Sequence, residues 1–242
     1  MALLETINLC KYFGGLKANH NISLQVEAGQ IYGLIGPNGA GKTTFLNAIS
    51  GVSPATSGQI FFDGEDVTNA KSYEMCQKGL ARTFQIVRSF RDLSVLENVV
   101  VGAIFGAGLS RAEAEKAAVK NLEFVNFPLD YNTKASALNT IQLKKVEMAR
   151  ALSCGCKMLL LDEVAAGLTP FELSEIAQLI KRIRDDLGIT IIIVEHLMKL
   201  IMDVCDELAV LYFGELLATG TPSEVSANEK VIKAYLGDNY ML

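Results

Sequence analysis

A glycine-rich segment that follows a short apolar run constrains the fold of this chain more than any other stretch. Residues 36 to 43, Gly-Pro-Asn-Gly-Ala-Gly-Lys-Thr, fit the pattern G-x-x-x-x-G-K-[ST]. Ile31 to Ile35 before them predicts a strand, and Thr44 to Ile49 after them predicts a helix. In such a strand, loop and helix, backbone N–H groups turn inward and bind phosphate oxygens. An ordinary glycine turn is the alternative, and the flanking strand and helix argue against it.

The loop offers each part of a site for nucleotide phosphates and Mg²⁺. Glycines let the backbone approach the phosphates, Lys42 reaches the β and γ phosphates, and the Thr43 hydroxyl binds Mg²⁺. The predicted phosphate-binding residues are Gly36, Pro37, Asn38, Gly39, Ala40, Gly41, Lys42, Thr43 and Thr44.

Composition limits the class of protein. With 242 residues, 50% of them hydrophobic, the chain suits one large α/β domain or one domain with a sizeable insertion, and we expect the second. The net charge is −5 and the Lys and Arg residues are dispersed, so we expect no nucleic-acid partner. No apolar run approaches the ~18 residues that cross a bilayer, and Met1 to Glu5 lacks a basic signal-peptide start. We therefore expect a cytoplasmic protein.

The cysteines form no recognisable metal-binding pattern. Their spacing contains no C-x-x-C pair, and no His cluster lies near Cys154 and Cys156. We interpret all of them as reduced structural residues. They are Cys10, Cys76, Cys154, Cys156 and Cys205.

The region before the loop predicts two strands, Leu3 to Leu9 and Ile22 to Val26, joined through a turn at Gly14 and Gly15. Two strands there indicate an antiparallel edge of the sheet. Phe13, beside Tyr12, could provide a flat platform for a purine ring, or both rings could close the edge of the core.

Between the loop and residue 153 the pattern changes from strands to helices. Residues 58 to 64 and 81 to 85 predict strands, the second ending at the amide of Gln85. From about Ser94 to Asn126 the pattern is helical, which predicts a helical insertion ending near Pro128. Another helix follows Asn139, with its apolar residues inward and Lys144, Lys145, Glu147 and Arg150 mostly outside.

The run from Lys157 to Glu163 is apolar and ends in two carboxylates, which is typical of a central parallel strand. In a nucleotide-binding sheet, Asp162 would hold Mg²⁺ through its water shell and Glu163 would polarise the attacking water. Two solvated charges at a strand end are the alternative, which the phosphate loop upstream disfavours.

The C-terminal third continues the alternation of helix and strand. An amphipathic helix from Phe171 to Leu187, with Leu187 on its apolar stripe, precedes a strand from Ile189 to Val194. His196 follows that strand, where a ring nitrogen could bond a γ phosphate, although a lone histidine is more often structural. Residues 207 to 213 and 215 to 219 predict a hairpin, and residues 223 to 236 predict short helices.

In this order the motifs resemble those of the ATP-binding subunit of an ABC transporter, over essentially the whole chain. The features are an aromatic residue before Gly14, a Walker A loop at Gly36 to Thr43, Gln85 as the Q-loop, a signature position at Leu138 to Gln142, Walker B at Asp162 and Glu163, and His196 as the switch histidine. The resemblance implies ATP and Mg²⁺ as ligands, with Phe13 against the base. It places Glu163, His196 and Gln85 in hydrolysis, and Thr43, Gln85 and Asp162 near the metal.

The same resemblance implies an α/β fold of the P-loop NTPase type. A parallel sheet core, an N-terminal antiparallel part and a helical insertion would together make a single ABC nucleotide-binding domain over residues 1–242. The core subdomain would comprise residues 1–85 and 155–242, and the helical subdomain residues 86–154.

Further segments are similar to the branched-chain amino-acid importer subfamily, namely residues 38 to 44, 82 to 85, 165 to 170, 194 to 196 and 231 to 236. This resemblance implies a motor subunit on the cytoplasmic face of the membrane. ATP would bind between two such chains, and hydrolysis would drive transmembrane permease subunits. A stand-alone ATPase acting on nucleic acid normally has tandem domains or a long coiled coil, and neither is present.

Two positions depart from the family pattern. The signature Leu-Ser-Gly-Gly-Gln is here Leu138-Asn139-Thr140-Ile141-Gln142. We expect Ile141 to place a branched side chain where backbone must approach a phosphate, while Asn139 could still cap the helix. Val164 replaces the proline that usually follows the catalytic Glu, which should loosen that turn.

The altered signature bears on the partners and on hydrolysis. Pairing with a related chain that has an intact signature would give a heterodimer with unequal sites, whereas a homodimer would work at a reduced rate. A regulatory subunit with little hydrolysis is the alternative function. The segment from Gln85 to Arg91 mixes apolar and basic residues, and we assign it to the membrane partner, although Phe90 could instead pack inside the insertion.

Overall fold

The central sheet carries the phosphate loop at its carboxyl edge in the computed structural model, which describes residues 2–85 and 88–236. Its strand order is β10-β9-β3-β8-β7-β6. The bounds are β3 (Ile31–Ile35), β6 (Leu80–Arg82), β7 (Met158–Asp162), β8 (Thr190–Val194), β9 (Glu207–Tyr212) and β10 (Glu215–Gly220). Neighbouring strands are parallel except β9 and β10, which form the predicted hairpin. The carboxyl ends of the parallel strands therefore meet at one edge, where ligands bind in open α/β sheets.

A second, antiparallel sheet has the order β2-β1-β4-β5. Its strands are β1 (Ala2–Phe13), β2 (Leu16–Glu27), β4 (Ser57–Phe62) and β5 (Glu65–Asp66). The predicted antiparallel pairing is confirmed, but the two strands are longer than predicted and form their own sheet instead of an edge of the central one. The sequence pattern did not predict the extra length because the added residues are mostly polar. They pair through the backbone and contribute little to the core.

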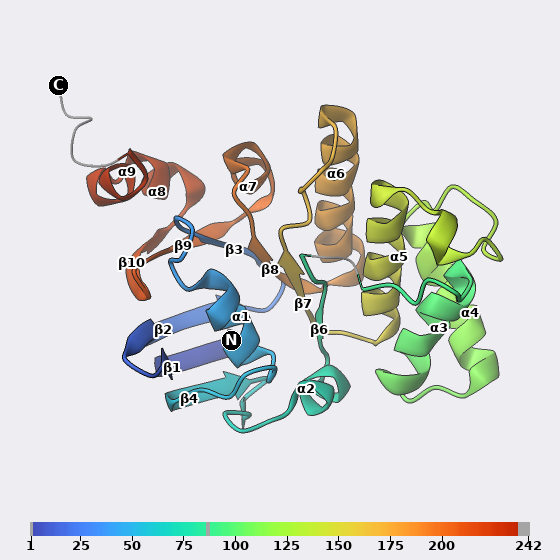
Figure 1. The fold of residues 1–242 in the computed structure, drawn as a ribbon, viewed down its shortest axis with the longest axis horizontal. Helices are drawn as coiled ribbons and strands as arrows, with labels where there is room; N and C mark the ends of the chain where they lie inside the picture. Colours follow the sequence, from blue (N-terminus) through green and yellow to red (C-terminus); the bar gives the residue numbers. More distant parts are fainter. Residues whose placement is uncertain (1, 86–87, 237–242) are drawn as a thin grey trace.

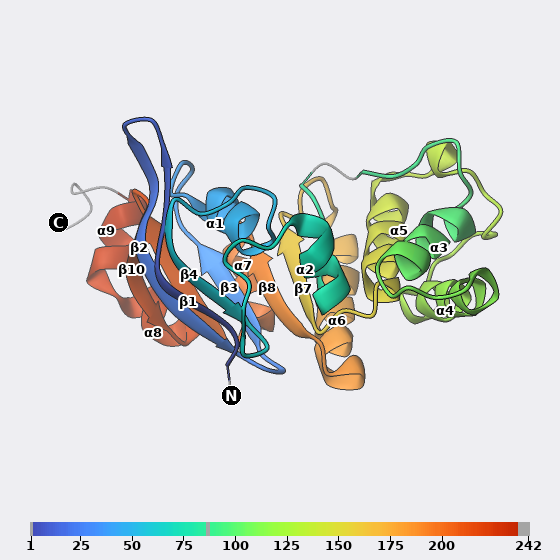
Figure 2. The same ribbon diagram turned by 90° about the horizontal axis from the view of Figure 1, so that it is seen from below.

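Helices cover both faces of the central sheet. They are α1 (Lys42–Ile49), α2 (Ser72–Lys78), α3 (Val95–Phe105), α4 (Arg111–Phe124), α5 (Thr140–Ser153), α6 (Pro170–Leu187), α7 (Met198–Val204), α8 (Pro222–Ala227) and α9 (Glu229–Leu236), with a 3₁₀ turn at Ala135–Ala137. Figures 1 and 2 show α3, α4 and α5 gathered at the end of the molecule remote from the antiparallel sheet. This group is the helical insertion that the sequence predicted. Among the described residues, no helix is both long and apolar enough to cross a membrane.

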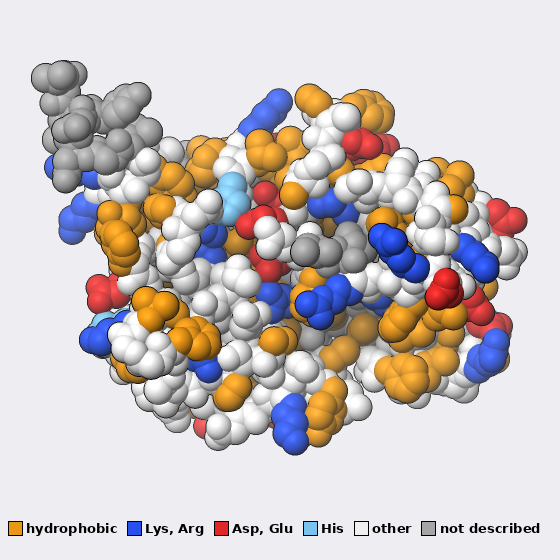
Figure 3. All heavy atoms as spheres, viewed as in Figure 1, with side chains coloured by type: hydrophobic (Ala, Val, Ile, Leu, Met, Phe, Trp, Pro, Cys, Tyr) orange, Lys and Arg blue, Asp and Glu red, His pale blue; other side chains and the backbone are white. Residues whose placement is uncertain are grey.

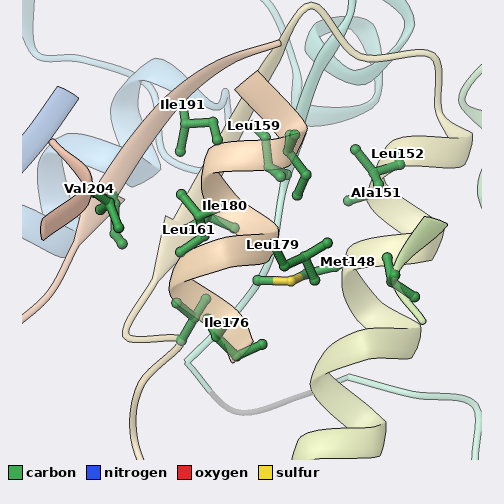
Figure 4. Packing of buried hydrophobic residues seen from close by; sticks show 14 of the residues in the cluster. Met148, Ala151, Leu152, Leu159, Leu161, Ile176, Leu179, Ile180, Ile191 and Val204 are labelled. Atoms are coloured by element: carbon green, nitrogen blue, oxygen red, sulfur yellow. The ribbon is translucent and has the colours of Figure 1, made fainter. Parts of the chain in front are cut away.

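Alternate residues of the central strands point into two separate hydrophobic layers. On one face, α1 packs between the central and antiparallel sheets around Phe45 and Phe62, both 1% exposed. On the other face, α6 lies between the sheet and α5. Figure 4 shows Met148 and Ala151 of α5 beside Leu179 of α6, with Leu159 and Leu161 of β7 behind. The helical insertion is therefore attached to the core through α5 and α6.

Two predictions about side-chain exposure are wrong. Lys144, Lys145 and Glu147 were expected mostly outside, yet they are 6%, 8% and 4% exposed. They can be buried because their charged ends have polar partners: Lys144 Nζ donates to Val164 O, Lys145 Nζ to Asn126 O, and Glu147 Oε1 accepts from Phe84 N. Leu187, expected on the apolar stripe of α6, is 38% exposed because the helix ends there.

Candidate functional site

The glycine loop takes a conformation that only glycine tolerates at its first and last glycines. Gly36 has φ +148° and Gly41 has φ +99°. A Cβ atom on Gly36 would lie 2.1 Å from Leu211 O, and one on Gly41 would lie 2.3 Å from Ala18 O. The loop is therefore packed between β2 and β9, and its backbone path is set by its neighbours.

Lys42 lies at the first position of α1, and its side chain folds back along the loop. Its Nζ donates to Gly36 O at 2.7 Å and to Pro37 O at 3.0 Å. Burial lowers the pKa of Lys42, while the nearby Glu163 and Asp162 carboxylates act in the opposite direction. An ammonium group held in this way is placed to bind an anion in the loop.

A cavity of about 370 Å³ opens above the loop. Figure 3 shows acidic and basic side chains and a histidine gathered at the centre of this face. The cavity is lined by Phe13, Leu16, Lys17, Ala18, Asn38, Gly39, Ala40, Gly41, Lys42, Thr43, Thr44, Glu163, His196 and Phe213. Of the two neighbouring aromatic residues, Phe13 lines the cavity, whereas the Tyr12 hydroxyl lies 2.7 Å from His20 Nδ1. The structure thus brings most of the predicted site residues to one place.

The predicted catalytic residues Gln85 and His196 both contact the third one, Glu163. Gln85 Nε2 donates to Glu163 Oε2 at 2.6 Å, and His196 Nε2 lies 3.0 Å from Glu163 Oε1. These residues follow β6, β7 and β8 respectively, so three neighbouring strands deliver them to one point. Glu163 itself has φ +51°, a left-handed conformation that is uncommon outside glycine and is often found at functional sites.

Hydrogen bonds to the Val194 backbone and to the Glu195 side chain hold this conformation. Glu163 N donates to Val194 O at 2.9 Å. Glu195 Oε1 accepts from Ala165 N at 2.6 Å, and its Oε2 accepts from His196 N at 3.3 Å. Burial raises the pKa of Glu195. The only hint in the sequence was that Glu195 adjoins His196.

Lys144 fixes the same turn from the side of α5. Its Nζ donates to Val164 O at 2.5 Å, and it lies 3.5 Å from Glu163 O. Burial lowers the pKa of Lys144, with the Glu195, Glu147 and Glu163 carboxylates opposing that shift. The turn in which Val164 replaces proline is therefore tied by side chains on both sides.

Asp162 has a partner that the sequence analysis did not name. Arg82 Nη2 donates to Asp162 Oδ2 at 2.8 Å, and the Arg82 and Asp162 side chains are 7% and 4% exposed. Arg82 also donates to Asn47 Oδ1 at 2.7 Å, which ties the pair to α1.

The other oxygen of Asp162 fits a role near a metal. Within residues 2–85 and 88–236, Oδ1 is buried and accepts no hydrogen bond. With the Thr43 hydroxyl and the Gln85 amide, it would provide oxygen donors of the kind that Mg²⁺ prefers. The donor set therefore fits Mg²⁺.

The signature segment forms the start of α5. Asn139 Oδ1 accepts from Gln142 N and Gln142 Oε1 accepts from Asn139 N, both at 3.0 Å, so Asn139 caps the helix as predicted. The expectation for Ile141 is wrong, because its side chain is 9% exposed and packs in the core. Thr140 instead is the exposed side chain at the helix start.

A groove of about 320 Å³ lies between α2 and the helical insertion. Tyr73, Phe84, Phe105, Arg150 and Cys154 are among the residues that line it. The segment assigned to a partner borders it, although Ile86 and Val87 lie outside the described residues. Phe90 is 50% exposed, and the Arg150 guanidinium lies 5.9 Å from the centroid of its ring.

Comparisons with known proteins agree with this geometry. A family model described as ABC transporter matches residues 19–166, and one described as branched-chain amino acid ATP-binding cassette transporter matches residues 215–240. The high-affinity branched-chain amino acid transport ATP-binding protein BraF of Pseudomonas aeruginosa is 39% identical over 98% of both chains.

Solved structures show the same fold. A nucleotide-free ATP-binding cassette from an ABC transporter is 33% identical with a TM-score of 0.89, covering 98% of this chain and 100% of the other. A dimeric ATP-binding cassette bound to ADP and Pi in a post-hydrolysis state is 26% identical with a TM-score of 0.80, covering 90% and 98%.

Proposed function

This chain belongs to the ABC transporter family of ATP-binding proteins, and from that membership we propose that it binds and hydrolyses ATP to power the import of branched-chain or related amino acids. The amino-acid class rests on relatives such as BraF and on the family match at residues 215–240. The observation that carries the ATPase role is the convergence of Lys42, Glu163 and His196 on one cavity.

The residues of the cavity have different roles in ATP hydrolysis. The loop and Lys42 bind the phosphates, and the ring of Phe13 lies against the base. Glu163 accepts the proton of the attacking water, and His196 orients the γ phosphate. Mg²⁺, held by Thr43, Gln85 and Asp162, would neutralise phosphate charge when it is bound.

Gln85 and His196 both bond to Glu163. The alternative of a regulatory subunit with little hydrolysis drew only on the altered signature. Within that signature, Ile141 packs in the core and Thr140 is exposed at the helix start.

We propose that ATP binds between this chain and a second ATP-binding subunit; the relative bound to ADP and Pi is dimeric. We propose a heterodimer, because the exposed Thr140 occupies the helix start where glycine would let the partner's γ phosphate approach. An oxyanion-type donor set contributes a few kcal/mol at a transition state, so weakening it in both sites would remove much of the turnover.

The dimer question is decided by the ATPase rate of this chain alone and of its Thr140→Gly variant. A large gain from Thr140→Gly supports the heterodimer with unequal sites. Brisk activity of the unmodified chain alone supports a homodimer. Ile141→Gly serves as the matched control, since it should reduce stability through the core without raising the rate.

The permease partner is proposed to dock on the groove between α2 and the helical insertion. Phe84, Phe105 and Arg150 give this surface the mixture of aromatic and Arg side chains that is enriched at interfaces. The same docking would hold the chain on the cytoplasmic face of the membrane, as a peripheral subunit.

The proposed ATP site is tested by Lys42→Ala with Lys120→Ala, an exposed lysine of α4, as the control. Lys42→Ala should abolish or greatly weaken ATP binding, measured by calorimetry, because the phosphate oxygens lose their cation. Lys120→Ala should bind ATP like the unmodified chain. Retention of full affinity by Lys42→Ala would show that the loop is not the phosphate site.

A further inference from the structure

The two-residue turn of the C-terminal hairpin contains Phe213, a large apolar residue in a left-handed backbone conformation and exposed to solvent. Phe213 and Gly214 join β9 to β10 with φ +47° and φ +81°. Turns with two positive φ angles favour Asn-Gly, and a bulky residue in that region is an outlier. The Phe213 side chain is also 78% exposed to solvent. Outliers of this kind are concentrated at functional sites, where another requirement outweighs local preference.

Phe213 faces the nucleotide cavity. It lines that cavity together with Phe13 and Leu16, which are 51% and 65% exposed and come from the opposite hairpin, β1–β2. The remaining lining is the phosphate loop, a short polar segment of β2, and the catalytic pair Glu163 and His196. The cavity therefore has an apolar, aromatic part distinct from its phosphate-binding part.

The turn is fixed to the phosphate loop by its own backbone. Gly214 N donates to Ala40 O at 3.1 Å, and His20 N donates to Gly214 O at 2.7 Å. A Cβ on Gly214 would lie 2.7 Å from Lys17 O, so the turn is packed tightly against β2. The turn that carries Phe213 is thus held against the phosphate loop by a direct hydrogen bond and against β2 by close packing.

The ring of Phe213 is also supported from its own strand. Tyr212 packs edge-on against it, with ring centroids 4.5 Å apart and an interplanar angle of 70°. Edge-to-face pairs of this kind are a favoured aromatic geometry and limit how the ring can turn.

We propose that Phe213 is a second aromatic contact for the adenine base, acting together with Phe13. This inference rests on the proposed ATP-binding function and assigns a binding residue to the same site. Stacking of a base on an aromatic side chain tolerates the identity of the base, so Phe213 would add affinity for nucleotides in general rather than select adenine.

The test compares ATP with inorganic tripolyphosphate, which has the phosphates but no base. The variant Phe213→Asn should weaken ATP binding on the order of tenfold, equivalent to about 1.4 kcal/mol, and leave tripolyphosphate binding unchanged. Because Asn suits a left-handed turn, the same variant should keep or raise the Tm. Phe213→Tyr should restore ATP affinity. Phe171→Ala is the matched control, since Phe171 is 74% exposed on α6 and does not line the cavity.

Three outcomes would overturn the assignment. Unchanged ATP affinity in Phe213→Asn would show that the ring does not contact the base. An equal loss for ATP and tripolyphosphate would show that the turn acts only by shaping the loop. Unchanged ATP affinity with lost binding of a second ATP-binding subunit would make Phe213 an interface residue. By contrast, an unmodified chain that binds neither ligand would refute the ATP site as a whole.

Discussion

Glu163 combines a left-handed backbone with a carboxylate that is bonded to Gln85 and His196. A non-glycine residue in a sparsely populated conformation costs on the order of 1–3 kcal/mol, so the surrounding hydrogen bonds must maintain it. The surrounding contacts therefore fix the position of the Glu163 carboxylate.

Replacing Glu163 by Gln should keep ATP binding and reduce turnover by at least ~10²-fold, because the amide cannot act as a general base. Single-turnover hydrolysis and nucleotide binding measure the two effects separately. Glu229→Gln, at an exposed position in α9, should leave both unchanged. Normal hydrolysis by Glu163→Gln would place the base elsewhere.

The buried ion pair of Arg82 and Asp162 makes a second prediction at this scale. Arg82→Met should lower the free energy of unfolding by about 3–5 kcal/mol, because it leaves the Asp162 charge buried without its partner. Arg111→Met breaks the exposed pair with Glu115 and should change it by less than ~1 kcal/mol. Urea denaturation measures both variants. Similar losses in the two would mean that the Arg82 pair is not decisive.

Helix α5 contacts two segments of the proposed site through side chains that the sequence pattern placed outside. Lys144 binds the turn after Glu163, and Glu147 binds the backbone that leads to Gln85. A helix of the insertion thereby holds residues of the catalytic cavity.

Lys144 and Lys145 allow a matched test of this contact, since both are buried and both donate to a backbone carbonyl. Only Lys144 contacts the catalytic turn; Lys145 binds Asn126 within the insertion. Lys144→Met should reduce kcat about tenfold or more at unchanged ATP affinity, because the Glu163 carboxylate loses its fixed position. Lys145→Met should reduce stability without lowering kcat. A similar kcat in the two variants would refute the role of Lys144 in catalysis.

The sequence predicts the helices and strands of this fold better than the contacts between distant segments. Alternation and apolar runs identified β3, β4, β6, β7, β8, β9 and β10 and the helices from α3 to α6, because burial on one face imposes a period on the sequence. The two-residue strand β5 was not predicted. The loop, Glu163 and His196 could be placed together because parallel strands share a carboxyl edge. Arg82, Glu195 and Phe213 were not identified, since their roles depend on contacts between distant segments. Ile141 was misjudged because helix rotation, and not its sequence position, decides which way its side chain points.

The whole molecule has a nucleotide cavity on the core and a groove at the junction with the insertion. The two surfaces are lined by different residues and are joined through β6, α5 and the catalytic turn. Substitutions confined to the groove should therefore impair coupling to a permease without changing ATP hydrolysis.

Charge reversal at Arg88 and Arg91, in the segment assigned to the permease, tests whether transport can be lost while ATP hydrolysis is kept. Both side chains are exposed, and the bond from Arg150 to Arg88 uses only the Arg88 carbonyl, so Arg88→Glu should not break it. The double variant should lose most transport in vesicles containing the permease and keep the basal ATPase rate. Arg111→Glu on α4 should transport normally. Loss of soluble folding in the double variant would instead support a packing role for these residues.

Helix α5 also has a thermodynamic consequence. It starts at the signature segment and ends at Ser153, next to Cys154, which lines the groove. Its 14 residues span ~21 Å as one unbroken helix. ATP binding and permease docking would therefore both act on this one helix, and we expect their binding free energies to be linked through it. If binding of the amino acid to the permease changes the affinity of this chain for ATP by some factor, then ATP binding must change the affinity of the permease for that amino acid by the same factor.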